Sequence, residues 1–262
     1  MPRLPASDRL LEIARVATED FGRLGYRATK TADVAAKAGM STGSLFTYVE
    51  SKEALFHLVF LHWFDMFSER LPVLPVATPG PGETLAVIEA GLRHVQMPRI
   101  RAALVEEEPA DVAEELREIV VERYALIERY WPLLRVIERC AVEMPGLEAA
   151  WFGLARAGTY AELGSYLKRR MEAGLLRPMP DSEVAARVVT ESLSWSAWHR
   201  REGRDATLYD DAAVRRTVVA FICAALVPQT VGETTACSLG LTKRAVTARE
   251  RTHRKGPHAR NQ

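Results

Sequence analysis

Apolar residues recur along this chain at intervals of three and four, which is the spacing of amphipathic helices. No stretch alternates apolar and polar residues between hairpin turns, so no sheet is predicted. The first helix is expected to begin after Ser7, with that hydroxyl as its N-cap, and to stop at Gly25. Two short helices are expected over residues 32–38 and 42–49. The pattern therefore predicts an all-α protein.

A fourth predicted helix, from Lys52 to about Arg70, is apolar on more than one side. Its two apolar stripes are Leu55/Val59/Met66 and Phe56/Phe60/Trp63/Phe67. A helix with several apolar sides is covered by protein on each of them. We therefore expect it to connect an N-terminal unit with a C-terminal one.

Prolines and glycines divide the remaining chain into a loop over residues 71–82 and a series of helices. The helices are expected over about residues 83–96, 98–107, 110–143, 147–173, 182–201 and 208–227. Pro132 lies inside the longest of them and should kink it, because proline lacks the amide hydrogen. Residues 228–262 lack apolar periodicity and are rich in Lys and Arg, which predicts a disordered basic tail.

The overall charge and the cysteines narrow the protein's class. The formal net charge of the 262 residues is +1, so any affinity for nucleic acid depends on where donors are placed. The three cysteines form no CxxC pair and no cluster with histidine, so we expect a reducing cytoplasm, no metal and no cofactor. The longest apolar run, residues 218–227, is shorter than the roughly 20 residues of a membrane span. We expect a soluble protein that makes no contact with membrane.

The segment from residue 25 to residue 55 has the pattern of a helix-turn-helix. Thr31 is expected to cap a helix whose inward side chains are small or apolar. Those inward residues are Val34, Ala35 and Ala38. Gly39 supplies the positive φ of a tight turn, and Ser41 is expected to cap the second helix. Small inward residues let two short helices cross closely, as they do in a helix-turn-helix that reads DNA.

The outward face of the second helix carries short hydroxyl side chains and a glycine. These residues are Thr42, Gly43, Ser44, Thr47 and Tyr48. Hydroxyls bind phosphates and several base edges, and a glycine lets the backbone come close to a groove. Lys52 follows at the start of the next helix, where it is placed as a point charge for a phosphate.

These residues and their spacing resemble the DNA-binding signature of the TetR family of transcription regulators. The matching positions are Phe21, Gly25-Tyr26, Thr29, Asp33-Val34-Ala35, Ala38-Gly39-Met40-Ser41, Gly43, Leu45, Tyr48, Ser51-Lys52-Glu53 and Leu55. The sequence departs from the family pattern at Lys30, Phe46 and Val49, where Thr, Tyr and Phe are usual. Phe46 lacks the hydroxyl that sometimes contacts a phosphate, and Lys30 offers a charged donor instead.

The resemblance implies an N-terminal three-helix helix-turn-helix domain, a connector helix and a C-terminal helical domain that binds an effector and dimerises. The expected boundaries are residues 1–51, 52–227 and 228–262. By the same resemblance, phosphate contacts fall on Lys30, Thr31, Thr47, Tyr48 and Lys52. The base-facing positions are Thr42, Gly43 and Ser44. They follow Ser41 at the start of the reading helix, which is the second helix of the helix-turn-helix.

The resemblance also places a homodimer interface on the last two helices, where four helices from two subunits form a bundle. The expected interface residues are Ala185, Val189, Ser192, Ser196, Val214, Val218, Phe221 and Ile222. Small residues along one face of the first of these helices allow close approach of another helix. The alternative is that the two helices are only a pair within the core of one chain.

Aromatic residues gather in the middle of the chain, where we expect a cavity for a small, mainly apolar or aromatic effector. The candidate effector-binding residues are Trp63, Phe67, His94, Tyr124, Trp131, Trp151 and Trp195. The alternative is that these side chains only fill the core.

The function implied is a dimeric repressor that leaves a palindromic operator when the effector binds and the connector helix moves. An activator and an architectural DNA binder without an effector remain alternatives. No enzyme is expected, because Walker, HExxH and Ser/His/Asp patterns are missing from the sequence. A metal or haem sensor using His57, His62 or Cys140 is disfavoured, since the two histidines are off one helical face.

Overall fold

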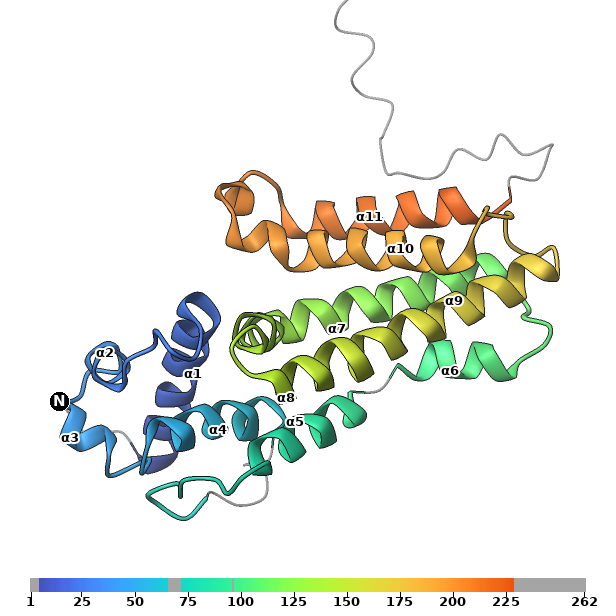
Figure 1. The fold of residues 1–262 in the computed structure, drawn as a ribbon. Coiled ribbons are helices and arrows are strands. Elements are labelled where there is room, and N and C mark those ends of the chain that lie inside the picture. Colours follow the sequence, from blue (N-terminus) through green and yellow to red (C-terminus); the bar gives the residue numbers. More distant parts are fainter. Residues whose placement is uncertain (1–4, 66–71, 96, 229–262) are drawn as a thin grey trace, which may run out of the picture. The chain divides into compact units, whose positions relative to one another are not determined.

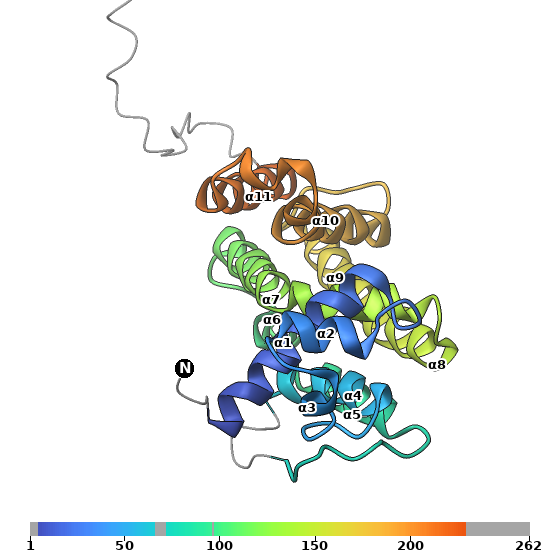
Figure 2. The ribbon, with the colours of Figure 1, turned by 90° about the vertical axis from the view of Figure 1, so that its left-hand side faces the viewer.

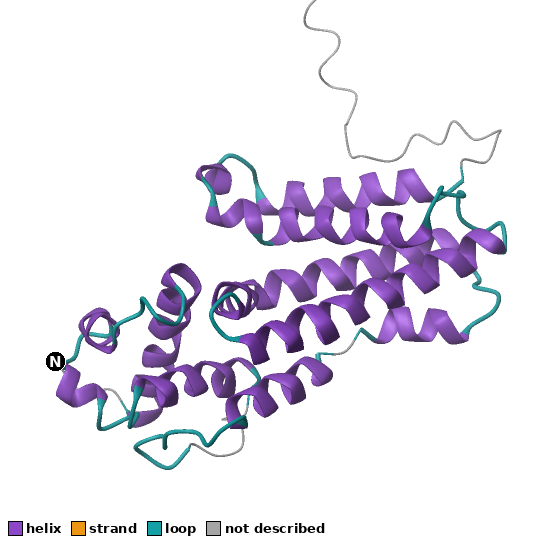
Figure 3. Ribbon diagram, in the orientation of Figure 1, coloured by secondary structure: helices purple, strands orange, loops and turns teal. Residues whose placement is uncertain are grey.

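The structure is a computed structural model that describes residues 5–65, 72–95 and 97–228. Within these ranges the chain is built of helices and loops without a strand, apart from an isolated bridge between Val49 and Val76 (Figure 3). The predicted all-α class is confirmed. No helix in the described part is both long enough and apolar enough to cross a bilayer. The predicted basic tail, from residue 229 onward, lies outside the described residues.

The first helix, α1 (Ala6–Leu24), ends as predicted but begins earlier. The predicted N-cap Ser7 is wrong, because Pro5 occupies the cap position and no side chain caps the helix. The Ser7 hydroxyl instead bonds to Asp8. Gly25 stops the helix with φ of 87°, and its amide donates to the Phe21 carbonyl at 3.0 Å. Only glycine adopts this backbone region readily.

Of the next two helices, α2 (Thr31–Lys37) begins and ends one residue before its predicted range, and α3 (Thr42–Leu45) ends four residues before its predicted end. Thr31 is already the first residue of α2, so its predicted role as N-cap is wrong. Lys30 holds the cap position, and its carbonyl accepts from the amide of Val34 at 3.2 Å. After α3 the chain makes hydrogen-bonded turns and then pairs with the loop at Val76. That pairing ends the helical segment before Val49.

The connector, α4 (Lys52–Trp63), is covered on all sides, as its two apolar stripes predict. Every residue from 54 to 60 is buried. The helix ends at Trp63 and not near Arg70, because Asp65 takes a positive φ of 57°. The residues that follow, from 66 to 71, lie outside the described ranges.

The body of the protein follows the loop that ends at Gly82. Its elements are α5 (Glu83–His94), α6 (Pro98–Val105), α7 (Val112–Ala141), α8 (Pro145–Glu148), a π-helical segment (Ala149–Arg156), α9 (Ala157–Glu172), α10 (Ser182–Ala197), two 3₁₀ turns (His199–Glu202 and Arg204–Thr207) and α11 (Asp211–Leu226) (Figure 1). α7 continues as one helix through Pro132. Helices α10 and α11 run side by side along one edge of the body (Figures 1 and 2).

The buried side chains form two clusters, and α7 contributes to both. The first cluster joins α1–α5 with the C-terminal end of α7. The second joins the N-terminal half of α7 with α6, α9, α10 and α11. α7 is therefore the element through which the helix-turn-helix and the body are packed together.

The proline-rich loop does more than connect α4 to α5. Its Val76 amide donates to the Tyr48 carbonyl at 2.8 Å, and its carbonyl accepts from the Glu50 amide at 3.0 Å. The Glu50 carboxylate in turn accepts from the Thr78 amide at 2.8 Å. These bonds hold the end of the helix-turn-helix against the loop, a contact that the sequence pattern did not predict.

Candidate nucleic-acid interface and interior cavity

The turn between α2 and α3 has the geometry that the sequence predicts. Gly39 has φ of 68°, and the Met40 amide donates to the Ala35 carbonyl at 3.0 Å. Ser41 caps α3, because its Oγ accepts from the Ser44 amide at 3.1 Å. The inward residues of α2 are buried, as predicted. The two helices therefore cross closely, with their hydroxyl-bearing residues directed outward.

All nine residues predicted to meet DNA have accessible surface. Lys30, Ser41, Gly43, Ser44 and Thr47 are exposed, and Thr31, Thr42, Tyr48 and Lys52 are half-buried. The hydroxyls of Ser41 and Ser44 lie 2.9 Å apart, and the Thr47 hydroxyl donates to the Ser44 carbonyl at 2.7 Å. These bonds give the outward hydroxyls defined positions before any ligand arrives.

Gly43 lies on this outward face with open space around it. A Cβ built at Gly43 would come no closer than 3.9 Å to another atom, the Ser41 Oγ. Its φ is not positive, so the protein's own fold tolerates a side chain at this position. Phe46, which stands where a tyrosine is usual in the family, is 42% exposed.

Lys52 is held in place by Tyr26, a position of the family signature, and by Arg27, which the sequence analysis did not single out. Its Nζ donates to the Arg27 carbonyl at 3.1 Å and lies 4.8 Å from the centre of the Tyr26 ring. The Tyr26 hydroxyl donates to Glu53 Oε1 at 2.9 Å. Burial, together with the Glu53 carboxylate, raises the pKa of Tyr26. The tyrosine therefore stays a neutral donor that orders the start of α4.

The loop after α1 is also attached to the far end of α7. The Arg27 amide donates to Glu143 Oε2 at 2.7 Å, and Arg139 Nη2 donates to the Leu24 carbonyl at 3.4 Å. A Cβ at Gly25 would lie 2.6 Å from Glu143 Oε1, so a side chain there would displace this carboxylate. The loop that supports Lys52 thus rests on Arg139 of α7 and on Glu143, which follows the end of that helix.

A cavity of about 350 Å³ lies in the body, between α5, α6, α7, α9, α10 and the π-helical segment, with Phe64 after α4 also on its wall. Its volume falls in the range of small-molecule sites, roughly 300–1,000 Å³. Among the predicted effector-binding residues whose side chains are described, Trp151 lines this cavity. Phe67 and the side chain of His94 lie outside what the structure describes.

The other aromatic candidates lie elsewhere. Trp63 and Trp131 line a separate depression of about 360 Å³ beside α1, where the Trp63 indole donates to Thr18 Oγ1 at 3.1 Å. Tyr124 is buried in the second cluster, and Trp195 is 50% exposed on α10. Aromatic type alone did not distinguish a cavity wall from core or surface, because this depends on how distant helices pack.

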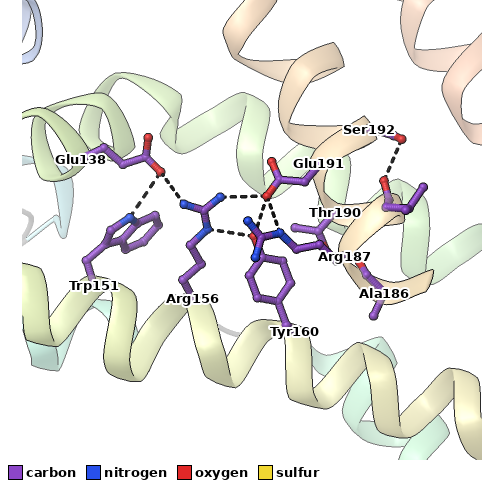
Figure 4. Close-up of polar contacts among 10 residues, drawn as sticks. Glu138, Trp151, Arg156, Tyr160, Ala186, Arg187, Thr190, Glu191 and Ser192 are labelled. Atoms are coloured by element: carbon purple, nitrogen blue, oxygen red, sulfur yellow. Dashed lines mark hydrogen bonds and ion pairs between the residues drawn. The ribbon is translucent and has the colours of Figure 1, made fainter. Parts of the chain in front are cut away.

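One wall of the cavity is a polar network centred on Arg156 (Figure 4). Its guanidinium meets Glu191 Oε1 at 2.8 Å and Glu138 Oε1 at 3.4 Å, and its Nε donates to the Tyr160 hydroxyl at 2.8 Å. Trp151 Nε1 donates to the same Glu138 oxygen at 3.4 Å. Burial raises the pKa of Glu138. The network joins the π-helical segment and α9 to α7 and α10, and the sequence analysis missed it.

No group of three or more His, Cys, Asp and Glu side chains is placed to hold a metal ion in the part of the chain that the structure describes. His57 is buried, and its Nδ1 forms a hydrogen bond with Thr84 Oγ1 at 2.9 Å. Burial lowers the pKa of His57, so its ring is neutral near pH 7.

In a comparison with known proteins, the N-terminal part of the chain matches a protein family. Residues 13–59 match the profile of the bacterial regulatory proteins of the tetR family. The matched segment runs from α1 into α4 and contains the whole helix-turn-helix. The resemblance noted from the sequence is confirmed. Comparison with curated proteins finds no match.

Two solved structures show the same fold. One is the ketosteroid transcriptional regulator KstR2 of Mycobacterium tuberculosis, 18% identical, with a TM-score of 0.56 over 86% of this chain and 98% of that chain. The other is a bacterial regulatory protein in the tetR family from Rhodococcus RHA1, 18% identical, with a TM-score of 0.51 over 86% of this chain and 100% of that chain. The helical body thus has the architecture of these regulators.

Proposed function

We propose that this chain, whose N-terminal domain is the DNA-binding domain of the tetR family, is a homodimeric repressor released from a palindromic operator by a small, mainly apolar molecule. One observation carries the proposal: the residues that match the family form a helix-turn-helix whose hydroxyl-bearing face is exposed. Such a face fits the major groove and its flanking phosphates.

The proposed DNA contacts divide into two sets. Thr42, Gly43 and Ser44 face the bases, because they lie at the start of α3, where Gly43 and Ser44 are exposed and Thr42 is half-buried. The phosphate contacts are Lys30, Thr31, Thr47, Tyr48 and Lys52, with Ser41 holding the helix start. Phosphate contacts set position and affinity, whereas base contacts set the preferred sequence.

The proposed dimer interface lies on α10 and α11. Of the residues predicted there, Val189, Ser196, Val218 and Ile222 are packed into the core of their own chain. Phe221 is 68% exposed, and the sequence analysis missed a neighbouring apolar row on α10. That row consists of Val184, Val188 and Trp195. We therefore move the proposed interface to these four exposed side chains. Two subunits are needed because one reading helix meets too few bases.

The proposed route from cavity to DNA is the C-terminal end of α7. Glu138 lines the cavity, while Arg139 and Glu143 hold the loop at residues 24–27. That loop in turn holds Lys52. A ligand that prefers a shifted α7 therefore also shifts the DNA-contacting residues. A coupling free energy of about 1–3 kcal/mol changes operator affinity by roughly 5–150-fold.

Two alternatives share the DNA-binding half of the proposal. In an activator, DNA occupancy raises transcription, so a reporter assay with the operator upstream of a promoter separates it from a repressor. An architectural DNA binder has no effector, and small apolar compounds then leave its thermal unfolding unchanged. The cavity and its ordered polar wall favour an effector.

The test of the function begins with selection of bound sequences from random double-stranded DNA by the purified protein. We expect enrichment of a palindrome, to which wild-type protein binds in fluorescence anisotropy. Gly43→Glu should weaken this binding at least about tenfold, since a carboxylate then faces phosphates and base acceptors. The space around Gly43 lets the variant keep its fold, which circular dichroism checks.

Ala161→Glu is the matched control, because it adds the same charge on the exposed face of α9. It should bind the selected DNA as the wild type does. The proposal is wrong if no sequence is enriched, or if Gly43→Glu binds as tightly as the control.

A further inference from the structure

Arg123 is a buried cation in the wall of the cavity. It lies on α7 and is 2% exposed. Its Nη2 donates to the Thr159 carbonyl at 3.2 Å, whereas its Nη1 has no hydrogen-bond partner among the described residues. It forms no ion pair with any residue that the structure describes. Glu162 attracts this guanidinium without forming an ion pair with it. A buried charge without a direct counter-ion is unfavourable, so the site favours the binding of an anion.

The other arginines of the cavity wall already have carboxylate partners. The pairs are Glu89 with Arg93 at 3.9 Å, Glu162 with Arg101 at 3.7 Å and Glu138 with Arg156 at 3.4 Å. Among the described Arg, Lys, Asp and Glu residues of the lining, each glutamate is thus matched by an arginine. Arg123 is the cation left over, so the wall carries one unbalanced positive charge.

The charge on Arg123 persists at neutral pH. Burial lowers the pKa of Arg123 to about 10, and a group with that pKa is protonated near pH 7. The unpaired Nη1 is therefore a charged donor, which forms stronger hydrogen bonds than a neutral one.

The cavity wall formed by α7 is polar at its two ends and apolar between them. Leu126, Ile127, Leu133 and Leu134 lie along it at the spacing of one helix face, with Tyr130 among them. Arg123 stands at one end of this row and Glu138 at the other. The negative end of an elongated anion is attracted by Arg123 and repelled by Glu138. The wall therefore sets the orientation in which such a ligand binds.

From this arrangement we propose that the effector is an apolar carboxylic acid. Its carboxylate binds Arg123, and its hydrocarbon or aromatic body lies along the apolar residues 126–134 of α7. This inference rests on the proposed function, of which it names the ligand class. A carboxylate carries one negative charge, which balances the single unpaired arginine. A phosphate monoester carries up to two and leaves a negative charge in excess.

The test measures binding of matched probes by isothermal titration calorimetry. Octanoate and hydrocinnamate are compared with octanol, which has the same apolar body as octanoate but no charge, and with octyl phosphate. Wild-type protein should bind a carboxylate at least about tenfold more tightly than the alcohol, as expected for a buried charge-assisted bond. Arg123→Met should remove this preference, and Arg123→Lys should keep part of it.

Arg117→Met is the control, since it removes an exposed arginine from the same helix and should leave the preference unchanged. The inference is overturned if octanol binds wild-type protein as tightly as either carboxylate, if neither carboxylate binds, or if Arg123→Met keeps the preference. Tighter binding of octyl phosphate than of octanoate overturns the carboxylate assignment. The comparison of the probes on wild-type protein tests the inference even if a variant fails to fold.

Operator binding measured on the same preparations tests the proposed function separately from the proposed ligand class. Protein that binds the selected palindrome but shows no preference for carboxylates disproves this inference and leaves DNA recognition standing. Protein that enriches no DNA sequence disproves the proposed function, whatever it binds in the cavity. If both hold, octanoate or hydrocinnamate should lower the anisotropy of the wild-type DNA complex and not that of Arg123→Met.

Discussion

At the scale of single residues, the neighbours of Lys52 fix its side chain before DNA binds. The ammonium group is fixed between the Arg27 carbonyl and the face of the Tyr26 ring. A free lysine loses side-chain conformational entropy when it meets a phosphate, on a scale of about 2 kcal/mol. Here part of that entropy is already lost in the unbound protein, so less is lost on binding DNA.

Lys52→Met should reduce the salt dependence of operator binding. Each lost phosphate contact lowers the slope of log K against log salt by about 0.9, because fewer counter-ions are released. Anisotropy titrations over a series of salt concentrations measure the slope. Lys168→Met, on the exposed face of α9, should leave it unchanged. An affinity that falls with no change of slope shows that Lys52 supports the loop and meets no phosphate.

At the scale of elements, a buried ion pair joins α7 to α9 within the second cluster. Arg170 of α9 donates to both carboxylate oxygens of Glu115 on α7, at 2.9 Å each. It also donates to the carbonyls of Ala103 and Glu107, at 3.0 Å each, so it joins α6 to the pair. The Tyr166 hydroxyl completes the site with a bond of 3.0 Å to Glu115. Three helices thus share one satisfied polar site inside an apolar cluster.

Arg170→Met should lower the free energy of unfolding by about 3–5 kcal/mol, because it leaves Glu115 without its counter-ion in the interior. Urea denaturation followed by circular dichroism measures the change. Adding Glu115→Leu to the variant should restore part of the stability, since no unpaired charge then remains. Arg117→Met removes an exposed arginine of α7 and should have a small effect. Stability lost equally by the single and the double variant contradicts the ion-pair explanation.

At the scale of the whole molecule, α10 and α11 carry four exposed apolar side chains. Val184, Val188 and Trp195 follow one face of α10, and Phe221 lies on the adjacent α11. Each of these four side chains is at least half exposed. An apolar row of this kind on paired helices is typical of a surface that a second subunit covers.

Phe221→Glu should raise the dissociation constant of the homodimer at least about tenfold, because an unpaired carboxylate is buried in an apolar contact. Sedimentation velocity across a range of protein concentrations measures it. Val105→Glu is the matched control: Val105 is 82% exposed at the end of α6 and lies outside the proposed interface. The control should remain dimeric. A dimer unchanged by Phe221→Glu places the interface elsewhere.

The sequence alone determined the features that depend on short-range chemistry. Helical spacing predicted the all-α class, and Gly39 and Ser41 predicted the turn and the cap of the reading helix, because both act within a few residues. The family signature from Phe21 to Leu55 was also recognised from the sequence, because it lies within one short continuous segment. The helix ends were less well predicted, as at Thr31 and Arg70, because neighbouring segments also decide where a helix stops.

The tertiary structure alone decided which side chains meet across the chain. Periodicity cannot tell the exposed Phe221 from the buried Ile222, since both lie on one apolar helix. The support of Lys52 by Arg27 and the charge balance around Arg123 join residues that are far apart in sequence or on different helices. Such contacts depend on how α4, α7 and α9 pack against one another. They are therefore set by burial and electrostatics in the folded chain and not by any local pattern.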